Sequence, residues 1–198
     1  MNDCATLSKR RTELNMPLQQ RFVILDRDGV INHDSPLYIK SPDEWRPIEG
    51  SLEAISALVQ AGIEVAVVSN QSAIGRGLLS EEMLKSIHAK MMLAVEKAGG
   101  RIAAIYYCPH HPDDACGCRK PALGMLRRLE LEHGILVAGI PLIGDKLTDI
   151  ELARRAGARP ILVRTGYGKE SLHSIDKSVA VYNNLACAVE ALLIEGST

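Results

Sequence analysis

Two carboxylates follow a short apolar run near the start of the chain. Residues Phe22 to Leu25 are all apolar, which predicts a buried strand of a parallel sheet, and Asp26 and Asp28 come directly after it. Because side chains alternate along extended backbone, both acids should leave the strand on the same side. Converging carboxylates repel each other, and a hard cation such as Mg²⁺ would offset that repulsion. An ordinary acidic turn is the alternative that these two residues leave open.

Further polar groups follow the later apolar runs. The run 63–68 ends in Ser69 and Asn70, a hydroxyl and a carboxamide that suit an anion held by hydrogen bonds, although alone they could simply end a strand. The run 141–144 is followed by Asp145, with Asp149 one turn later, and Lys120 lies in the segment after the run 102–107.

These groups together indicate one reaction class. The carboxyl ends of parallel strands meet at one edge of a sheet, which is where ligands bind in open α/β folds. Acids for Mg²⁺, a lysine for phosphate oxygens and a carboxylate nucleophile are the groups that phosphoryl transfer needs. The sequence therefore predicts a phosphoryl-transfer site at that edge.

A cysteine-rich loop lies between the run 102–107 and Lys120. Its pattern, Cys-x-His-x5-Cys-x-Cys, predicts a closed structural Zn²⁺ site made of Cys108, His110, Cys116 and Cys118. His111 is the rival imidazole. A closed site leaves no position for substrate, so the zinc would hold the loop that carries Arg119 and Lys120.

The elements that must position these groups alternate along the chain. Helices are expected over residues 51–61, 81–98, 121–133, 148–156 and 184–193, with Ser51 and Ser80 as caps. With a short edge strand over 179–182, this alternation predicts an α/β fold with a doubly wound parallel sheet. Residues 31–49 are expected to form a loop, and the spacing of the motifs leaves no room for a separate cap domain.

Length and composition set limits on function. With 198 residues, we expect a disordered tail over 1–20 and a single domain over 21–198. A net charge of -1 and only 4% aromatic residues argue against nucleic acid as a partner. No run reaches the ~20 apolar residues of a membrane span, and no signal peptide is evident. We expect a cytoplasmic monomer that does not associate with membranes.

The motifs resemble those of the haloacid dehalogenase superfamily of phosphohydrolases. The matching residues span 22–168 and comprise Asp26-Arg27-Asp28-Gly29-Val30, Ser69-Asn70, Lys120 and Gly144-Asp145-Lys146-x-x-Asp149. The wider set, with Cys-Pro-His-His-Pro and Cys-x-Cys-Arg-Lys-Pro, is similar to the heptose bisphosphate phosphatases and to the related histidinol-phosphate phosphatases.

This resemblance implies a Rossmann-like fold and roles for individual residues. Asp26 would be the nucleophile and Asp28 the general acid and base, while Ser69 and Lys120 would contact phosphoryl oxygens. Asp26, Asp28 (through its carbonyl) and Asp145 would bind Mg²⁺. Asn70 would orient Asp28 or the substrate. The substrate-binding set would be Asp34, Tyr38, Asn70, Gln71, Ser72, Arg119 and Lys146. Asp149 would support the metal site or stabilise a helix start.

The resemblance also implies a substrate. It indicates Mg²⁺-dependent hydrolysis of the 7-phosphate of D-glycero-D-manno-heptose 1,7-bisphosphate, which would give heptose 1-phosphate for nucleotide-heptose and lipopolysaccharide core synthesis. Histidinol phosphate is the alternative substrate. Two alternative functions of a different kind are a phospho-accepting receiver and a zinc-dependent interaction module.

Overall fold

The computed structural model describes residues 22–196, and its centre is one parallel sheet of six strands in the order β3-β2-β1-β4-β5-β6. The strands are β1 Phe22–Leu25, β2 Glu64–Asn70, β3 Ala104–Cys108, β4 Pro141–Gly144, β5 Arg159–Val163 and β6 Ala180–Tyr182. On β1, Leu25 pairs with Val67 of β2 and with Ile143 of β4. The carboxyl end of β1 therefore lies between those of β2 and β4.

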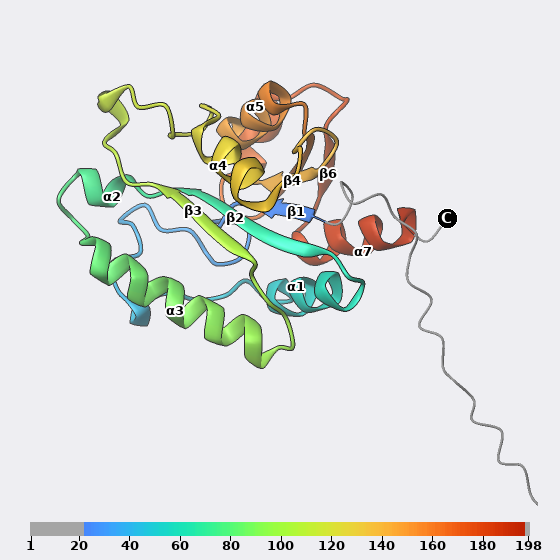
Figure 1. The fold of residues 1–198 in the computed structure, drawn as a ribbon, viewed down its shortest axis with the longest axis horizontal. Helices are drawn as coiled ribbons and strands as arrows, with labels where there is room; N and C mark the ends of the chain where they lie inside the picture. The colour runs from blue at the N-terminus through green and yellow to red at the C-terminus, as the bar shows by residue number, and fades with distance from the viewer. Residues whose placement is uncertain (1–21, 197–198) are drawn as a thin grey trace, which may run out of the picture.

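Helices cover both faces of this sheet, which confirms the predicted doubly wound α/β fold (Figure 1). They are α1 Ser51–Gln60, α2 Ser72–Gly75, α3 Glu81–Lys97, α4 Gly124–His133, α5 Leu147–Ala156, α6 Gly168–Ser171 and α7 Leu185–Glu195, with 3₁₀-helices at Pro42–Glu44, Pro112–Asp114 and Leu172–Ser174. Helices α1, α3 and α7 lie on one face, and α4 and α5 lie on the other (Figure 1). No helix among the described residues is long and apolar enough to cross a membrane.

The side chains of β1 divide between two apolar layers. Val23 and Leu25 pack with the buried residues of α1, α3 and α7, whereas Phe22 and Ile24 pack with those of α4 and α5. All four are buried, and burial of each large apolar side chain stabilises the fold by about 1.5–3 kcal/mol. This two-sided burial explains why the run has no polar alternation.

Several boundaries differ from those predicted. Strand β2 continues through Ser69 and Asn70, because their backbones pair with Tyr107 and Cys108 of β3. Ser51 is the first residue of α1 and not its cap; Gly50 occupies the cap with φ 78°, and the Ser51 hydroxyl donates to the Ile31 carbonyl.

The prediction for the start of α4 was also wrong. This helix begins at Gly124, three residues later than expected, because Gly117 accepts a backbone hydrogen bond from Gly124 and ties the chain to the cysteine loop. The cap at Ser80 is confirmed, since its hydroxyl accepts from the Met83 amide. The predicted tail over 1–20 lies outside the described residues. Within residues 22–196, none of the connections contains a second sheet.

Candidate active site

Four ionisable side chains meet at the carboxyl edge of the sheet. Lys120 Nζ lies 2.8 Å from Asp26 Oδ1 and 2.6 Å from Asp149 Oδ1, and it also donates to the Val68 carbonyl at 2.9 Å. Carboxylate oxygens of Asp26, Asp145 and Asp149 all lie within 4.8 Å of one another. All four side chains are buried, so the lysine charge is matched by acids that water barely reaches.

Glycines allow this close packing around Asp145. A Cβ at Gly29 would lie 2.2 Å from Asp145 Oδ2, and a Cβ at Gly166 would lie 2.1 Å from the same oxygen. Both glycines have positive φ, 84° and 56°, which other residues rarely adopt. Gly29 of the first motif is therefore sterically required by Asp145, the acid that follows β4.

The electrostatics of the cluster favour a bound cation. Burial raises the pKa of Asp26 to about 6 even though Lys120 lies beside it. Burial and then the charge of Asp26 raise the pKa of Asp145 to about 8. Asp145 Oδ1 is buried and has no hydrogen-bond partner among the described residues. An orphaned oxygen in a cluster of hard oxygen ligands fits Mg²⁺, whose charge would stabilise the ionised acids.

Asp28 belongs to a different network. Its carboxylate accepts from Arg27 Nε at 3.0 Å, Arg27 Nη2 at 2.9 Å, Asn32 Nδ2 at 2.9 Å and Gln71 Nε2 at 2.9 Å. Burial alone would raise the pKa of Asp28, but the charge of Arg27 and the hydrogen bonds of Asn32 and Gln71 outweigh it and lower the pKa. Because β1 ends at Leu25, the alternation of side chains along a strand does not apply to Asp28. Of the two acids of the first motif, only Asp26 joins the acidic cluster.

The residues at the end of β2 hold other site residues. Asn70 binds the backbone of Lys120 in both directions, with Nδ2 donating to the carbonyl at 3.3 Å and Oδ1 accepting from the amide at 2.9 Å. Gln71 is buried between Asp28 and the Ser69 hydroxyl, to which it donates at 2.9 Å. Ser69 and Ser72 are also buried. Of the two amides, Gln71 orients Asp28, whereas Asn70 positions Lys120.

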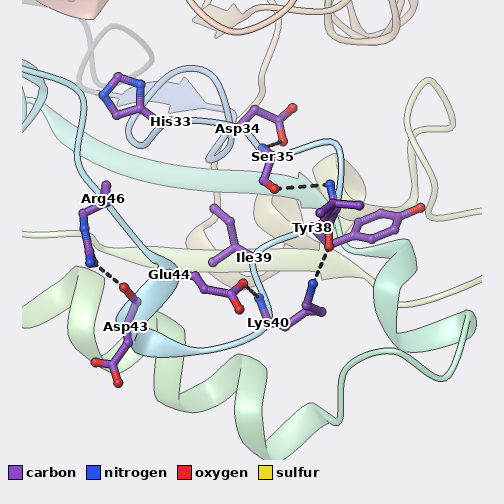
Figure 2. A pocket seen from close by; sticks show the side chains of 10 residues that line it. His33, Asp34, Ser35, Tyr38, Ile39, Lys40, Asp43, Glu44 and Arg46 are labelled. Atoms are coloured by element: carbon purple, nitrogen blue, oxygen red, sulfur yellow. Dashed lines mark hydrogen bonds between the residues drawn. The ribbon is translucent and has the colours of Figure 1, made fainter.

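A hollow of about 540 Å³ opens beside the site, in the segment 33–46 (Figure 2). Asp34 and Tyr38 line it, and Figure 2 shows them on the same stretch of loop. Asp34 also pairs with Lys146, whose Nζ lies 2.7 Å from Asp34 Oδ2 and 4.8 Å from the centre of the Tyr167 ring. Lys146 therefore links the rim of the hollow to the end of β4.

Arg119, which precedes Lys120 in the chain, has a side-chain nitrogen that makes no hydrogen bond within residues 22–196. That nitrogen, Nη1, is buried. A buried guanidinium donor without a partner costs free energy unless a ligand satisfies it. An anionic group would do so.

Sequence reasoning missed the segment after β5. Thr165 Oγ1 donates to the Gly29 carbonyl at 2.6 Å, and the Tyr167 amide donates to Asp145 Oδ2 at 2.8 Å. Ser171 Oγ donates to the Asp145 carbonyl at 2.9 Å. The signal was available, because these residues follow the carboxyl end of another parallel strand.

The cysteine loop gathers its four predicted ligands. Cys116 Sγ lies 3.5 Å from Cys108 Sγ and 3.6 Å from Cys118 Sγ, and His110 Nδ1 lies 3.5 Å from Cys108 Sγ and 3.2 Å from Cys118 Sγ. A zinc tetrahedron with Zn–S bonds of about 2.3 Å has edges of about 3.8 Å, which these separations approach. His111 instead caps the following 3₁₀-helix by accepting from the Asp113 amide.

Comparison with protein-family models identifies the superfamily to which the chain belongs. Residues 22–137 match the family model described as polynucleotide kinase 3 phosphatase, and residues 117–188 match the model described as HAD-hydrolase-like. The chain is thus a phosphohydrolase of the haloacid dehalogenase superfamily, as the motifs predicted.

Individual relatives narrow the class. The chain is 45% identical to D-glycero-beta-D-manno-heptose-1,7-bisphosphate 7-phosphatase of Bordetella bronchiseptica, over 88% of this chain and 99% of the relative. The relative of the same name in Pseudomonas aeruginosa is also 45% identical, over 89% and 99%. The chain therefore belongs to the D,D-heptose 1,7-bisphosphate phosphatase family.

Solved structures agree with this assignment. The B. bronchiseptica phosphatase complexed with magnesium and phosphate superposes with a TM-score of 0.86 at 45% identity, covering 88% of this chain and 99% of that chain. The Burkholderia thailandensis phosphatase gives a TM-score of 0.69 at 37% identity, over 87% and 98%.

Proposed function

We propose that this chain is a Mg²⁺-dependent phosphatase that removes the 7-phosphate of D-glycero-D-manno-heptose 1,7-bisphosphate. The observation that carries the proposal is the buried convergence of Asp26, Asp145, Asp149 and Lys120, in a chain whose 45% identical relative was crystallised with magnesium and phosphate. The product, heptose 1-phosphate, would serve nucleotide-heptose and lipopolysaccharide core synthesis.

Asp26 is the nucleophile in this proposal. Its carboxylate oxygen attacks phosphorus, the bond from phosphorus to the sugar oxygen breaks, and an aspartyl-phosphate forms on Asp26. Water then attacks that phosphorus, the bond from phosphorus to the Asp26 oxygen breaks, and inorganic phosphate leaves with the carboxylate free. Asp26 and Asp145, with the Asp28 carbonyl, would hold Mg²⁺, which supplies positive charge between the carboxylate and the anionic phosphate.

Asp28 is the proton-transfer group. It protonates the departing sugar oxygen and later takes a proton from the attacking water. In the free protein its four hydrogen bonds favour the ionised form, which suits the second step. The negative charge of a bound phosphate favours protonation of Asp28, which the first step requires.

Two positively charged groups and a hydroxyl bind the anionic parts of the substrate. Lys120 and Ser69 stabilise the phosphoryl oxygens, and Asp149 and Asn70 hold Lys120 in place. Arg119 binds the second phosphate of the bisphosphate through its unused donor.

The sugar contacts come from the hollow and its rim. Asp34 and Tyr38 line the hollow, and Lys146 reaches its edge, so these three contact sugar hydroxyls. Gln71, which also donates to Asp28, and Ser72 complete the proposed substrate-binding set.

The cysteine loop would hold a structural zinc. Cys108, His110, Cys116 and Cys118 would supply its four protein ligands, which would leave no position for substrate. Arg119 and Lys120 follow Cys118 directly, so a bound zinc would fix the start of that segment.

A phosphate-release assay tests the function. The purified chain is given the heptose bisphosphate, histidinol phosphate and 4-nitrophenyl phosphate, each with Mg²⁺ and with a chelator. We expect the highest kcat/KM with the heptose bisphosphate and no turnover after Mg²⁺ is removed. Faster hydrolysis of histidinol phosphate would reassign the substrate, and full activity without divalent cation would refute the metal role.

A further inference from the structure

A buried histidine lies behind the proton-transfer network. His88 is on α3, only 6% of its surface is exposed, and its Nε2 lies 3.4 Å from Arg27 Nη1. Its ring also meets Tyr107 edge-on, with centroids 5.8 Å apart. The reaction described above does not use His88.

The contact with Arg27 determines the state of this histidine. Arginine only donates hydrogen bonds, so His88 Nε2 must be the unprotonated nitrogen of a neutral ring. Burial and then the charge of Arg27 lower the pKa of His88 to about 4, which keeps the ring neutral near pH 7. His88 is therefore an acceptor that carries no charge.

Arg27 uses its whole guanidinium in this arrangement. Nε and Nη2 hold the two oxygens of Asp28, Nη2 also donates to Gln71 Oε1 at 3.1 Å, and Nη1 faces His88. Its side chain is 1% exposed, so the protein alone determines the orientation of the guanidinium plane. The contacts with Asp28, Gln71 and His88 together fix the plane of the guanidinium, and His88 holds the edge opposite the fork.

A neutral hydrogen-bond acceptor is the suitable partner for Nη1 of Arg27. A carboxylate at the same place would compete with Asp28 for the charge of Arg27, and an apolar side chain would leave Nη1 buried without a partner. Histidine avoids both costs. The choice of residue at position 88 thus matches a requirement of the Arg27–Asp28 pair.

We propose that His88 is a positioning residue that fixes the Arg27 guanidinium, so that the fork of Arg27 holds the Asp28 carboxylate in line with the departing sugar oxygen. This inference rests on the proposed function, since it assigns His88 to the proton-transfer step of that reaction. It predicts that His88 affects substrates according to how much their leaving groups need a proton.

The test compares kcat/KM for two substrates in the full chain with Mg²⁺. The sugar oxygen of the heptose bisphosphate needs protonation as it departs, whereas the 4-nitrophenolate of 4-nitrophenyl phosphate departs readily without it. His88→Leu removes the acceptor. We expect about a 10-fold or greater loss with the bisphosphate and less than about a 3-fold loss with the aryl phosphate, because only the first depends on general acid catalysis.

Three further variants complete the experiment. His88→Gln restores an acceptor near the Nε2 position and should recover the bisphosphate rate to within about 3-fold. His88→Asn, which is shorter, should behave like His88→Leu and serves if the leucine variant does not fold. His133→Leu is the matched control, because His133 lies on α4 and makes a similar edge contact with Phe22. It should leave both rates unchanged.

Two results would overturn the inference. One is an equal loss on both substrates for His88→Leu or His88→Asn, which would indicate a purely structural histidine. The other is a failure of His88→Gln to recover selectivity while its thermal unfolding matches that of the wild type. If the wild type itself hydrolyses neither substrate, the proposed function fails first, and the role of His88 falls with it.

Discussion

The acidic site and the cysteine loop are both candidate metal centres, yet the chain builds them in opposite ways. The acids Asp26, Asp145 and Asp149 come from distant parts of the sequence and are buried. The four predicted zinc ligands lie within a stretch of 11 residues, and three of them are partly exposed or exposed. The first site exists only when several strands have paired, whereas the second is built from one loop and the end of β3, which holds Cys108.

The two regions are nevertheless connected through one short stretch of backbone. Lys120, which pairs with two of the acids, lies two residues after Cys118, a predicted zinc ligand. Asn70 of β2 holds the backbone of Lys120 from the side of the sheet. The cysteine loop and a distant strand therefore position the same lysine, and each region can be disrupted separately.

The largest expected effect comes from breaking the acidic site at Asp26. Asp26→Asn keeps the shape of the side chain but replaces the nucleophile with an amide, so we expect hydrolysis to fall on the order of 10⁴-fold or more. Thermal unfolding should show that the fold is retained. Residual activity above a few per cent of the wild type would contradict the role of Asp26.

Breaking the cysteine loop should lower stability and activity together. Cys118→Ser removes one thiolate, and the loss of a structural zinc should reduce Tm on the order of 10 °C and release the ion. Zinc content by atomic absorption and thermal unfolding measure this. Cys187→Ser on α7 is the matched control, because Cys187 lies outside the cluster. If the wild-type protein carries no zinc, the prediction of a zinc site in this loop is wrong.

Arg119 tests how the acidic site and the cysteine loop are connected, because it lies between them in the chain. Arg119→Ala should reduce kcat/KM about 10- to 100-fold with the bisphosphate, the value of a lost hydrogen-bonded charge pair. The effect on 4-nitrophenyl phosphate, which has no second phosphate, should be small. Arg128→Ala on α4 is the control, since that guanidinium is exposed and pairs with Glu132. Equal losses on the two substrates would exclude Arg119 from recognition of the second phosphate.

The smallest expected effect concerns stability and pH. The pKa of His88 falls from 6.5 to about 4 on folding, so the unfolded chain binds the proton first, and stability from this group is lost as pH falls below 6.5. The negative charge of Asp28, which also faces this network, raises the pKa of His88, but burial and the charge of Arg27 outweigh it. Between pH 6 and pH 5, His88→Gln should remove about 1 kcal/mol of the pH dependence of unfolding. Urea titrations at the two pH values measure it, and an unchanged slope would contradict a buried neutral His88.

Much of the architecture could be predicted because it depends on local signals. Two-sided burial of the run 22–25 and the alternation of strands and helices predicted a parallel sheet, and parallel strands bring their carboxyl ends to one edge. This is why Asp26, Lys120 and Asp145 were expected together. The zinc ligands were predictable for a simpler reason, since their spacing alone brings them within reach of one ion.

What only the tertiary structure decided is which partner each polar side chain takes. The partners of Asp28 depend on where β1 ends. Gln71, and not Asn70, orients Asp28, because Asn70 binds the backbone of Lys120, 50 residues away. The contact of His88 with Arg27 spans 61 residues, and Thr165 reaches Gly29 across 136. Residue types and spacing determine which strand ends carry chemistry, whereas hydrogen-bond geometry between distant segments depends on packing that no local pattern encodes.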